Sequence, residues 1–267
     1  MTTPVYIFDP DSNIAKKQMH IDSDIERVYF LQGCKKVISI GGDGRFLQTF
    51  RILSEGDYLN SHVLYGINAG TLGFLTNELD AEFSGRRAIH IYPGMFDKLH
   101  QRRMLLDVYI DGAFKGTVLN EVTMHPLELG KLFTANMTVF ENHRMHGDSV
   151  LTYKGDGLIV STPSGSTAYN LSCGGPIVEP LNESIVITPI SPFSLSARPI
   201  VLNSDKQLVI TFENNVNKKA AIVLDGVQYK DAEEIKIIKS DKYLTMIQSA
   251  NFFDAIHAKL GWNNSIK

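Results

Sequence analysis

The sequence predicts a two-domain fold, with an α/β N-terminal domain followed by a predominantly antiparallel β C-terminal domain. Over about the first 95 residues, short apolar strands alternate with helical stretches, which predicts a mostly parallel sheet. From about residue 98, short β-like runs follow one another instead. Asp-Gly pairs at 111–112 and 225–226 lie beside or between such runs and predict tight hairpins. We therefore expect domains at residues 1–97 and 98–249.

The first part contains three candidate strands and one or two candidate helices. The strands are the apolar runs at 5–8, 37–40 and 62–67. Apolar residues at helical spacing predict a helix over 45–53. The polar segment 12–30 is either a helix or a loose connection.

The second part reads as a series of strands that form a sheet packed on a sheet. A helical pattern returns only near the C-terminus, where residues 252–260 (FFDAIHAKL) predict a short helix. The expected strands are 104–110, 113–122, 134–141, 157–161, 184–188, 207–212, 220–224 and 235–238.

Composition narrows the class of protein. The 267 residues are 43% hydrophobic and 21% charged, as in ordinary globular domains, and the net charge of −3 argues against a nucleic-acid partner. No apolar run approaches the roughly 20 residues of a membrane helix, and the N-terminus lacks the pattern of a secretory signal. Two cysteines, Cys34 and Cys173, suit reduced thiols. We expect a cytoplasmic protein with no membrane partner.

The most informative segment is Gly41-Gly-Asp-Gly44, between a predicted strand and a predicted helix. Glycines there allow the main chain to approach a ligand, and the N–H groups of the first helical turn favour phosphate. A carboxylate beside phosphates is costly unless it binds a metal ion or accepts a proton, which makes Asp43 a candidate catalytic base. An equally ordinary alternative is that Asp43 caps the helix.

Three further segments could contact a ligand. Residues 66–76 (GINAGTLGFLT) form a second glycine-rich loop after a strand, although an ordinary βα turn explains such a loop equally well. Residues 154–176 combine glycine pairs with many short hydroxyls, including Thr162 and Ser164, that suit a polar ligand. Asn120-Glu121 lies in an apolar β context, where a buried amide or acid needs a partner such as a ribose hydroxyl or an adenine edge. His143 and His146 more simply form a polar hairpin end than a metal pair.

Taken together, these segments resemble the NAD kinase family. The matching pieces are GGDG at 41–44, NAGTLGFLT at 68–76, NE at 120–121, GDGLIVSTPSGSTAYNLSCGGP at 155–176 and DG at 225–226. The resemblance implies Mg²⁺-dependent transfer of a phosphoryl group from ATP or polyphosphate to the 2′-hydroxyl of the adenosine ribose of NAD. It also implies a homo-oligomer, commonly a tetramer, and a C-terminal tail, 250–267, that completes the first domain.

The resemblance also assigns residue roles. Asp43 matches the aspartate taken as the general base, and Gly42 and Gly44 match glycines that face phosphate. Asn120 and Glu121 match the pair that binds the adenosine part of NAD. The remaining matches are Asn68, Gly70, Leu72 and Phe74 in the second loop, and Asp156, Thr167, Ala168, Tyr169 and Ser172 along the NAD site.

Two positions depart from the family pattern. Arg45 stands where a small polar residue is usual, so it could add a phosphate contact or restrict the donor. Lys154 replaces an arginine, which keeps the charge and loses the bidentate fork. Two other functions stay open on the sequence: a lipid or sugar kinase with a related GGDG motif, and an NAD(H)-binding module without turnover. The sequence also leaves open ATP against polyphosphate, NAD against NADH, and feedback by NADP.

Overall fold

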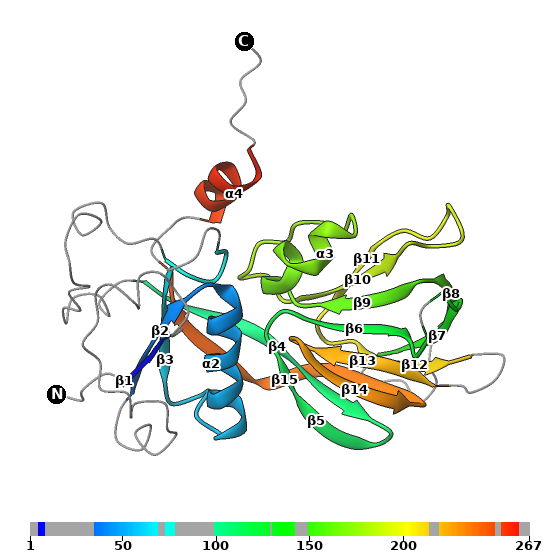
Figure 1. Ribbon diagram of the computed structural model, residues 1–267, viewed down its shortest axis with the longest axis horizontal. Helices are drawn as coiled ribbons and strands as arrows, with labels where there is room; N and C mark the ends of the chain where they lie inside the picture. The colour runs from blue at the N-terminus through cyan, green and yellow to red at the C-terminus, as the bar shows by residue number, and fades with distance from the viewer. Residues whose placement is uncertain are drawn as a thin grey trace, which may run out of the picture. The chain divides into compact units, whose positions relative to one another are not determined.

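The computed structural model describes residues 5–8, 35–68, 73–77, 99–128, 130–141, 149–213, 219–248 and 252–261 (Figure 1). These residues divide into two compact units, one from within Met1–Arg103 and Leu244–Lys267, the other from within Met104–Tyr243. The unit boundaries fall inside strands β4 (His100–Ile110) and β15 (Glu234–Ile247). Each of these strands therefore contributes residues to both units. In the described part of the chain, no helix is long and apolar enough to cross a membrane.

The first unit is built on parallel strands. β1 (Val5–Phe8) pairs with β2 (Lys36–Gly41), and β2 pairs with β3 (Val63–Asn68), both in parallel. The end of β15 adds to β3, also in parallel, through Met246 and Ile247. Helix α2 (Asp43–Glu55) follows β2 and packs against β2 and β3 (Figure 1).

The sequence explains why α2 packs closely on this sheet. Phe46, Phe50 and Leu53 recur at helical spacing and are fully or almost fully buried. Gly66 of β3 lies under Phe46, because a Cβ at Gly66 would be 2.6 Å from the phenylalanine ring. A glycine at this point of the strand therefore lets the helix approach.

The expected strands 5–8, 37–40 and 62–67 and the helix 45–53 are confirmed within a few residues. Helix α4 (Phe252–Leu260) has the expected bounds. The segment 12–30 lies outside the described residues. The α/β character of this part and the antiparallel β character of the rest agree with the fold class expected from the sequence.

The second unit contains two antiparallel sheets. The first is six-stranded and the second is formed around β12. The six strands, in sheet order, are β11 (Ile200–Asn203), β10 (Ser184–Ile190), β9 (Gly157–Ser161), β6 (Glu121–Pro126), β13 (Ala220–Leu224) and β14 (Val227–Ala232). The other sheet contains β15, β12 (Gln207–Phe212), β7 (Phe133–Phe140) and β8 (Ser149–Gly155) in that order, with β4 beside β15 and β5 (Ala113–Val118) beside β4.

One hydrophobic cluster joins these two sheets. It takes residues from both of them, for example Val160 and Ile187 from the six-stranded sheet and Phe133 and Ile210 from the other. All four side chains are 2% exposed or less. The expected packing of sheet on sheet is therefore confirmed for this unit.

Several strand assignments from the sequence need correction. The run 113–122 was expected as one strand, but the chain leaves the sheet after Val118 and resumes as β6 at Glu121. β15 is much longer than the expected 235–238. β8, β11 and β14 were not expected, because all three lie at sheet edges, where exposed residues interrupt the apolar run.

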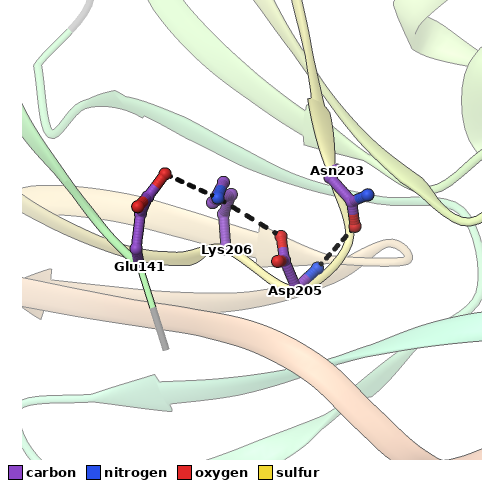
Figure 2. Close-up of polar contacts among 4 residues, drawn as sticks. All are labelled: Glu141, Asn203, Asp205 and Lys206. Carbon is purple, nitrogen blue, oxygen red and sulfur yellow. Dashed lines mark hydrogen bonds and ion pairs between the residues drawn. The ribbon is translucent and has the colours of Figure 1, made fainter. Parts of the chain in front are cut away.

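A polar cluster fixes the turn between β11 and β12 (Figure 2). Lys206 Nζ lies 2.9 Å from Glu141 Oε1, at the end of β7, and 3.6 Å from Asp205 Oδ1. Asn203 Oδ1 accepts a hydrogen bond from the main-chain N–H of Asp205 at 3.1 Å. Partly exposed ion pairs of this kind stabilise a protein little, so the cluster mainly sets the local conformation of the turn.

The Asp-Gly turn between β13 and β14 also holds the segment that precedes β6. Asp225 and Gly226 have φ values of 43° and 89°, as the expected hairpin requires. The Asp225 carboxylate accepts hydrogen bonds from the main-chain N–H groups of residues 119, 120 and 121, at 2.6, 3.0 and 3.0 Å. It thereby supplies acceptors for amides that have left one strand and not yet entered the next.

Burial alters the acidity of two carboxyl groups at this point. It raises the pKa of Glu121 to about 8, and the negative charge of Asp225 contributes further to that rise. Burial also raises the pKa of Asp225 to about 6, although its three amide donors oppose the change. Glu121 is therefore protonated in the folded chain over a pH range in which an unfolded glutamate is ionised.

Gly165→Ala should destabilise the second unit. Gly165 belongs to the short helix η3 (Ser164–Thr167), and a Cβ there would lie 2.2 Å from the main-chain oxygen of Asn120. Main chain cannot move aside cheaply, so we expect a loss of about 1–3 kcal/mol in the free energy of unfolding, measured by urea denaturation. Gly44→Ala is the matched control, because no atom lies within 4 Å of a Cβ at that helical position. Equal stability of the Gly165→Ala variant and wild type would contradict this packing.

Glu121→Gln should flatten the pH dependence of stability. Because the folded pKa of about 8 lies above the unfolded value near 4.5, Glu121 favours folding most below pH 4.5. That contribution is lost as pH rises towards 8, at roughly 1.4 kcal/mol per pKa unit as an upper bound. Urea denaturation at pH 5 and pH 8 should show a larger fall for wild type than for Glu121→Gln. The same fall in both proteins would rule out the raised pKa of Glu121.

Candidate active site

The structure places Asp43 at the first turn of α2 and ties its carboxylate to the second loop. Asp43 Oδ2 accepts a hydrogen bond from the Phe74 N–H at 2.7 Å. Asp43 Oδ1 accepts bonds from the Leu75 N–H at 3.1 Å and from Thr76 Oγ1 at 3.3 Å. The alternative that Asp43 caps the helix is wrong, because Gly42 is the N-cap and no side-chain capping bond forms. The carboxylate joins two glycine-rich segments instead.

The second loop returns to the strand from which it leaves. The Asn68 N–H donates to the Asn77 oxygen, and the Asn77 N–H donates to the Gly66 oxygen, both at 2.8 Å. The Asn77 side chain is buried and donates to the oxygens of Gly66 and Ile247 at 2.9 Å each. The base of the loop is therefore fixed between β3 and β15. Asn68 is buried at the end of β3, whereas Gly70 and Leu72 lie outside the described residues.

Gly41, Gly42 and Gly44 differ in backbone conformation and surroundings. Gly41 has a φ of 155°, which side chains rarely allow. Gly42 has an ordinary φ of −85°, and a Cβ at Gly42 or Gly44 would meet no described residue within 4 Å. The protein's own packing thus leaves space beside Gly42 and Gly44. Arg45 follows in the same helical turn and is half-buried.

The second unit gathers buried polar atoms that have no hydrogen-bond partner in the structure. Among the described residues, three of the four such atoms are Asn120 Oδ1, Glu121 Oε2 and Ser164 Oγ, and the fourth is Ser184 Oγ. Asn120 and Ser164 are only 6% and 5% exposed. Gly165, next to Ser164, packs directly on the Asn120 main chain, which brings these side chains to one place. Buried polar atoms without partners are costly, so this arrangement suits a ligand that supplies hydroxyl or amide groups.

The neighbouring hydroxyls have different tasks. Thr162 Oγ1 donates to the Leu119 oxygen and accepts from the Gly165 N–H at 3.2 Å, so it ties η3 to the segment before β6. Thr167 Oγ1 donates to the Ser164 oxygen at 3.4 Å. Thr162 thus serves the fold, in contrast to Ser164.

The short helix α3 (Tyr169–Ser172) begins after Ala168 and presents an exposed tyrosine. Tyr169 is 40% exposed, Ser172 is exposed and Ala168 is half-buried. The main chain of Tyr169 is hydrogen-bonded to Glu121, which opposes the rise in the pKa of that acid. Tyr169 therefore lies beside the partnerless atoms described above, with a ring surface free for contact.

Lys154 and Asp156 lie where β8 turns into β9, and both are exposed. The Asp156 N–H donates to the Ile190 oxygen at 3.0 Å, which fixes the turn. Burial raises the pKa of Tyr169, and the charge of Asp156 is among the smaller contributions. Asp156 is therefore near enough to influence the tyrosine electrostatically.

Four polar residues that order the site were not selected from the sequence. Asp225 had a signal, the Asp-Gly pair that predicted a turn and matched the family, but Asp225 was not selected as a site residue. Asn77, Arg103 and Gln248 belong to no motif, and their contacts join segments far apart in the chain. His143 and His146 lie outside the described residues. Within the described ranges, no group of three or more His, Cys, Asp or Glu is placed to hold a metal ion.

Comparison with known proteins places this geometry in a family. A family model described as the ATP-NAD kinase C-terminal domain matches residues 119–249. An NAD kinase of Blochmanniella pennsylvanica is 36% identical over 238 residues, covering 86% of this chain and 75% of the relative. An NAD kinase of Buchnera aphidicola subsp. Schizaphis graminum is 37% identical over 239 residues, covering 86% and 77%.

Solved structures share the fold. A yeast NADH kinase complexed with NADH has a TM-score of 0.71 at 24% identity, covering 88% of this chain and 69% of that one. An NAD kinase from Archaeoglobus fulgidus in complex with ATP has a TM-score of 0.70 at 25% identity, covering 86% and 84%. With relatives above 30% identity aligned over three quarters of their length, the chain belongs to the NAD kinase family of enzymes.

Proposed function

We propose that this chain transfers a phosphoryl group from ATP or polyphosphate to the 2′-hydroxyl of the adenosine ribose of NAD, forming NADP. The observation that carries the proposal is the Asp43 carboxylate, fixed at a helix N-terminus beside two glycines whose outer faces are open. In a site that only binds phosphate, a carboxylate at this position would repel the ligand. It is useful to a site that takes a proton from an attacking hydroxyl.

The hydrogen bonds of Asp43 leave it able to accept that proton. An ionised carboxylate offers about four acceptor positions. The second loop occupies one on Oδ2 and two on Oδ1. Oδ2 therefore keeps a lone pair for the 2′-hydroxyl, while the three donors hold the group in one orientation. Because general-base catalysis depends on such positioning, the loop supports the role.

The open faces of Gly42 and Gly44 support a phosphate position. The first N–H groups of an α-helix lack acceptors within the helix and carry partial positive charge. No described residue lies within 4 Å of the position that a Cβ would take at Gly42 or Gly44, which leaves room for a ligand oxygen beside this helix N-terminus. Arg45, in the same turn, would add positive charge beside the donor phosphates.

The partnerless atoms of the second unit support binding of the adenosine part of NAD. Glu121 Oε2 could accept from a ribose hydroxyl, and Asn120 Oδ1 from the amino group of adenine. Tyr169 offers an aromatic surface for stacking. Asp156, Thr167 and Ser172 border the same region, and we propose them as further NAD contacts.

The proposal includes Mg²⁺ bound together with the donor. In nucleotide sites Mg²⁺ commonly takes one or two carboxylates and completes its shell with phosphate oxygens and water. The one free acceptor position of Asp43 is proposed for the 2′-hydroxyl, so the donor phosphates and water would hold the ion. When bound, the ion neutralises charge on the donor phosphates. The family resemblance further supports a homo-oligomer, most simply a tetramer, acting in the cytoplasm.

Asp43→Asn should abolish most turnover and leave NAD binding intact. Loss of a general base lowers kcat by roughly 10²–10⁴-fold. The amide keeps the shape of the carboxylate, so the dissociation constant for NAD should change little. NADP formed from NAD, ATP and Mg²⁺ would be counted with an NADP-specific dehydrogenase, and NAD binding by calorimetry. A folded Asp43→Asn protein with near-normal kcat would remove Asp43 from the role, and no NADP from wild type with ATP or polyphosphate would overturn the function.

Gly44→Ala should weaken donor binding without weakening the fold. The added methyl group would enter the space beside the first turn of α2 where the phosphates are proposed to lie. Because alanine is also the better helix former, stability should be unchanged or higher. We expect KM for ATP to rise about 10-fold or more, with KM for NAD little affected. An unchanged KM for ATP would place the phosphates elsewhere.

A further inference from the structure

Arg103 is a buried guanidinium without a carboxylate partner among the described residues. It is 2% exposed at the start of β4 and donates to Gln101 Oε1 at 2.7 Å and to Gln248 Oε1 through a short contact. Burial lowers its pKa to about 10, so it stays charged at neutral pH. Burying a cation costs stability unless its donors are satisfied. Here two amide oxygens, rather than an acid, satisfy it in part.

This contact fixes the orientation of the Gln248 side chain. A guanidinium can only donate, so Gln248 must present its oxygen to Arg103. The amide nitrogen then points the other way, and Nε2 donates to the main-chain oxygen of Phe74 at 3.3 Å. A flipped amide would oppose donor to donor at Arg103. Arg103 thus decides which atom of Gln248 faces the second loop.

The Phe74 oxygen belongs to the same peptide group as the Leu75 N–H. That peptide group is planar, so a bond to its oxygen also orients its N–H. The Leu75 N–H donates to Asp43 Oδ1, and the preceding Phe74 N–H donates to Asp43 Oδ2. Hydrogen bonds at both ends of a peptide group also polarise and strengthen each other. A chain of contacts therefore runs from Arg103 through Gln248 and the 74–75 peptide to Asp43.

We infer that Gln248 is a positioning residue for phosphoryl transfer, which orients the Asp43 carboxylate through the peptide between Phe74 and Leu75, with Arg103 fixing the orientation of Gln248. The inference rests on the proposed function, because it assigns Gln248 a task in the reaction for which Asp43 is the base. Gln248 itself contacts neither reacting atom. Its effect should therefore appear in kcat rather than in the binding of NAD.

Gln248→Glu is the sharpest test. The carboxylate has the same shape and gains an ion pair with Arg103, so the fold should be as stable as wild type or more so. It removes the only N–H donor of this side chain and sets a negative charge against the Phe74 oxygen. We expect kcat to fall about 10-fold, KM for NAD to stay within about 2-fold, and the Phe74 and Leu75 amides to exchange hydrogen faster.

Two further variants separate positioning from general weakening. Gln101→Ala removes the other acceptor of Arg103 without touching the second loop, and its kcat and amide exchange should match wild type. In the Asp43→Asn background, Gln248→Glu should lower the residual rate no further, because both changes act on one group. Additive losses would mean that Gln248 acts by another route.

The two measurements, kcat and amide hydrogen exchange, distinguish failure of this inference from failure of the proposed function. Wild-type NADP formation with a normal kcat for Gln248→Glu would overturn the positioning role and leave the proposed function standing. Amide exchange needs no turnover. Unchanged protection of residues 74 and 75 in Gln248→Glu would overturn the inference even if wild type formed no NADP.

Discussion

Main-chain N–H groups in loops and at the beginnings of strands need acceptors, and aspartate carboxylates supply them at three described places. Asp43 receives the amides of residues 74 and 75, and Asp225 receives those of 119–121. Asp111, in the other Asp-Gly turn, receives those of 233 and 234. A carboxylate can serve several donors at once, which an asparagine or serine cannot do equally well. The loop beside Asp43 in the first unit and the segment before β6 in the second unit are both held in this way.

Much of the fold could be predicted from the sequence, because its main signals are local. The apolar runs around β2 and β3, the helical spacing of Phe46, Phe50 and Leu53, and the Asp-Gly turns each report on a few neighbouring residues. Edge strands such as β8 and β11 were missed because their exposed residues carry no hydrophobic pattern. The break between β5 and β6 was missed because Leu119 and Asn120 carry no proline or glycine turn signal, and their amides are satisfied from Asp225, more than a hundred positions away.

The same distinction between local signals and long-range contacts applies to the candidate site. Motifs identified the residues that would face a ligand: Asp43, the open glycines, and the Asn120-Glu121 pair. They could not identify what holds those residues in place. Thr162 was selected as a ligand contact because it is a hydroxyl in a polar loop, yet its bonds join η3 to Leu119. Gln248 could not be selected from the sequence, because its contacts with the Arg103 guanidinium and the Phe74 carbonyl exist only in the folded chain.

The division of β15 between the two units bears on how the chain folds during synthesis. Residues 104–243 form one compact unit from a continuous stretch, so they can complete their pairing as soon as that stretch has left the ribosome. The parallel sheet of the first unit is different. Strand β3 cannot pair with β15 until Met246 and Ile247 have been synthesised, and the loop at Phe74 lacks its hydrogen bond until Gln248 has been added. The GGDG segment, although translated early, cannot take its final form until the chain has been made past residue 248. Chains that end between residues 243 and 248 would contain the whole second unit and lack the contact of Gln248 with the loop that holds Asp43.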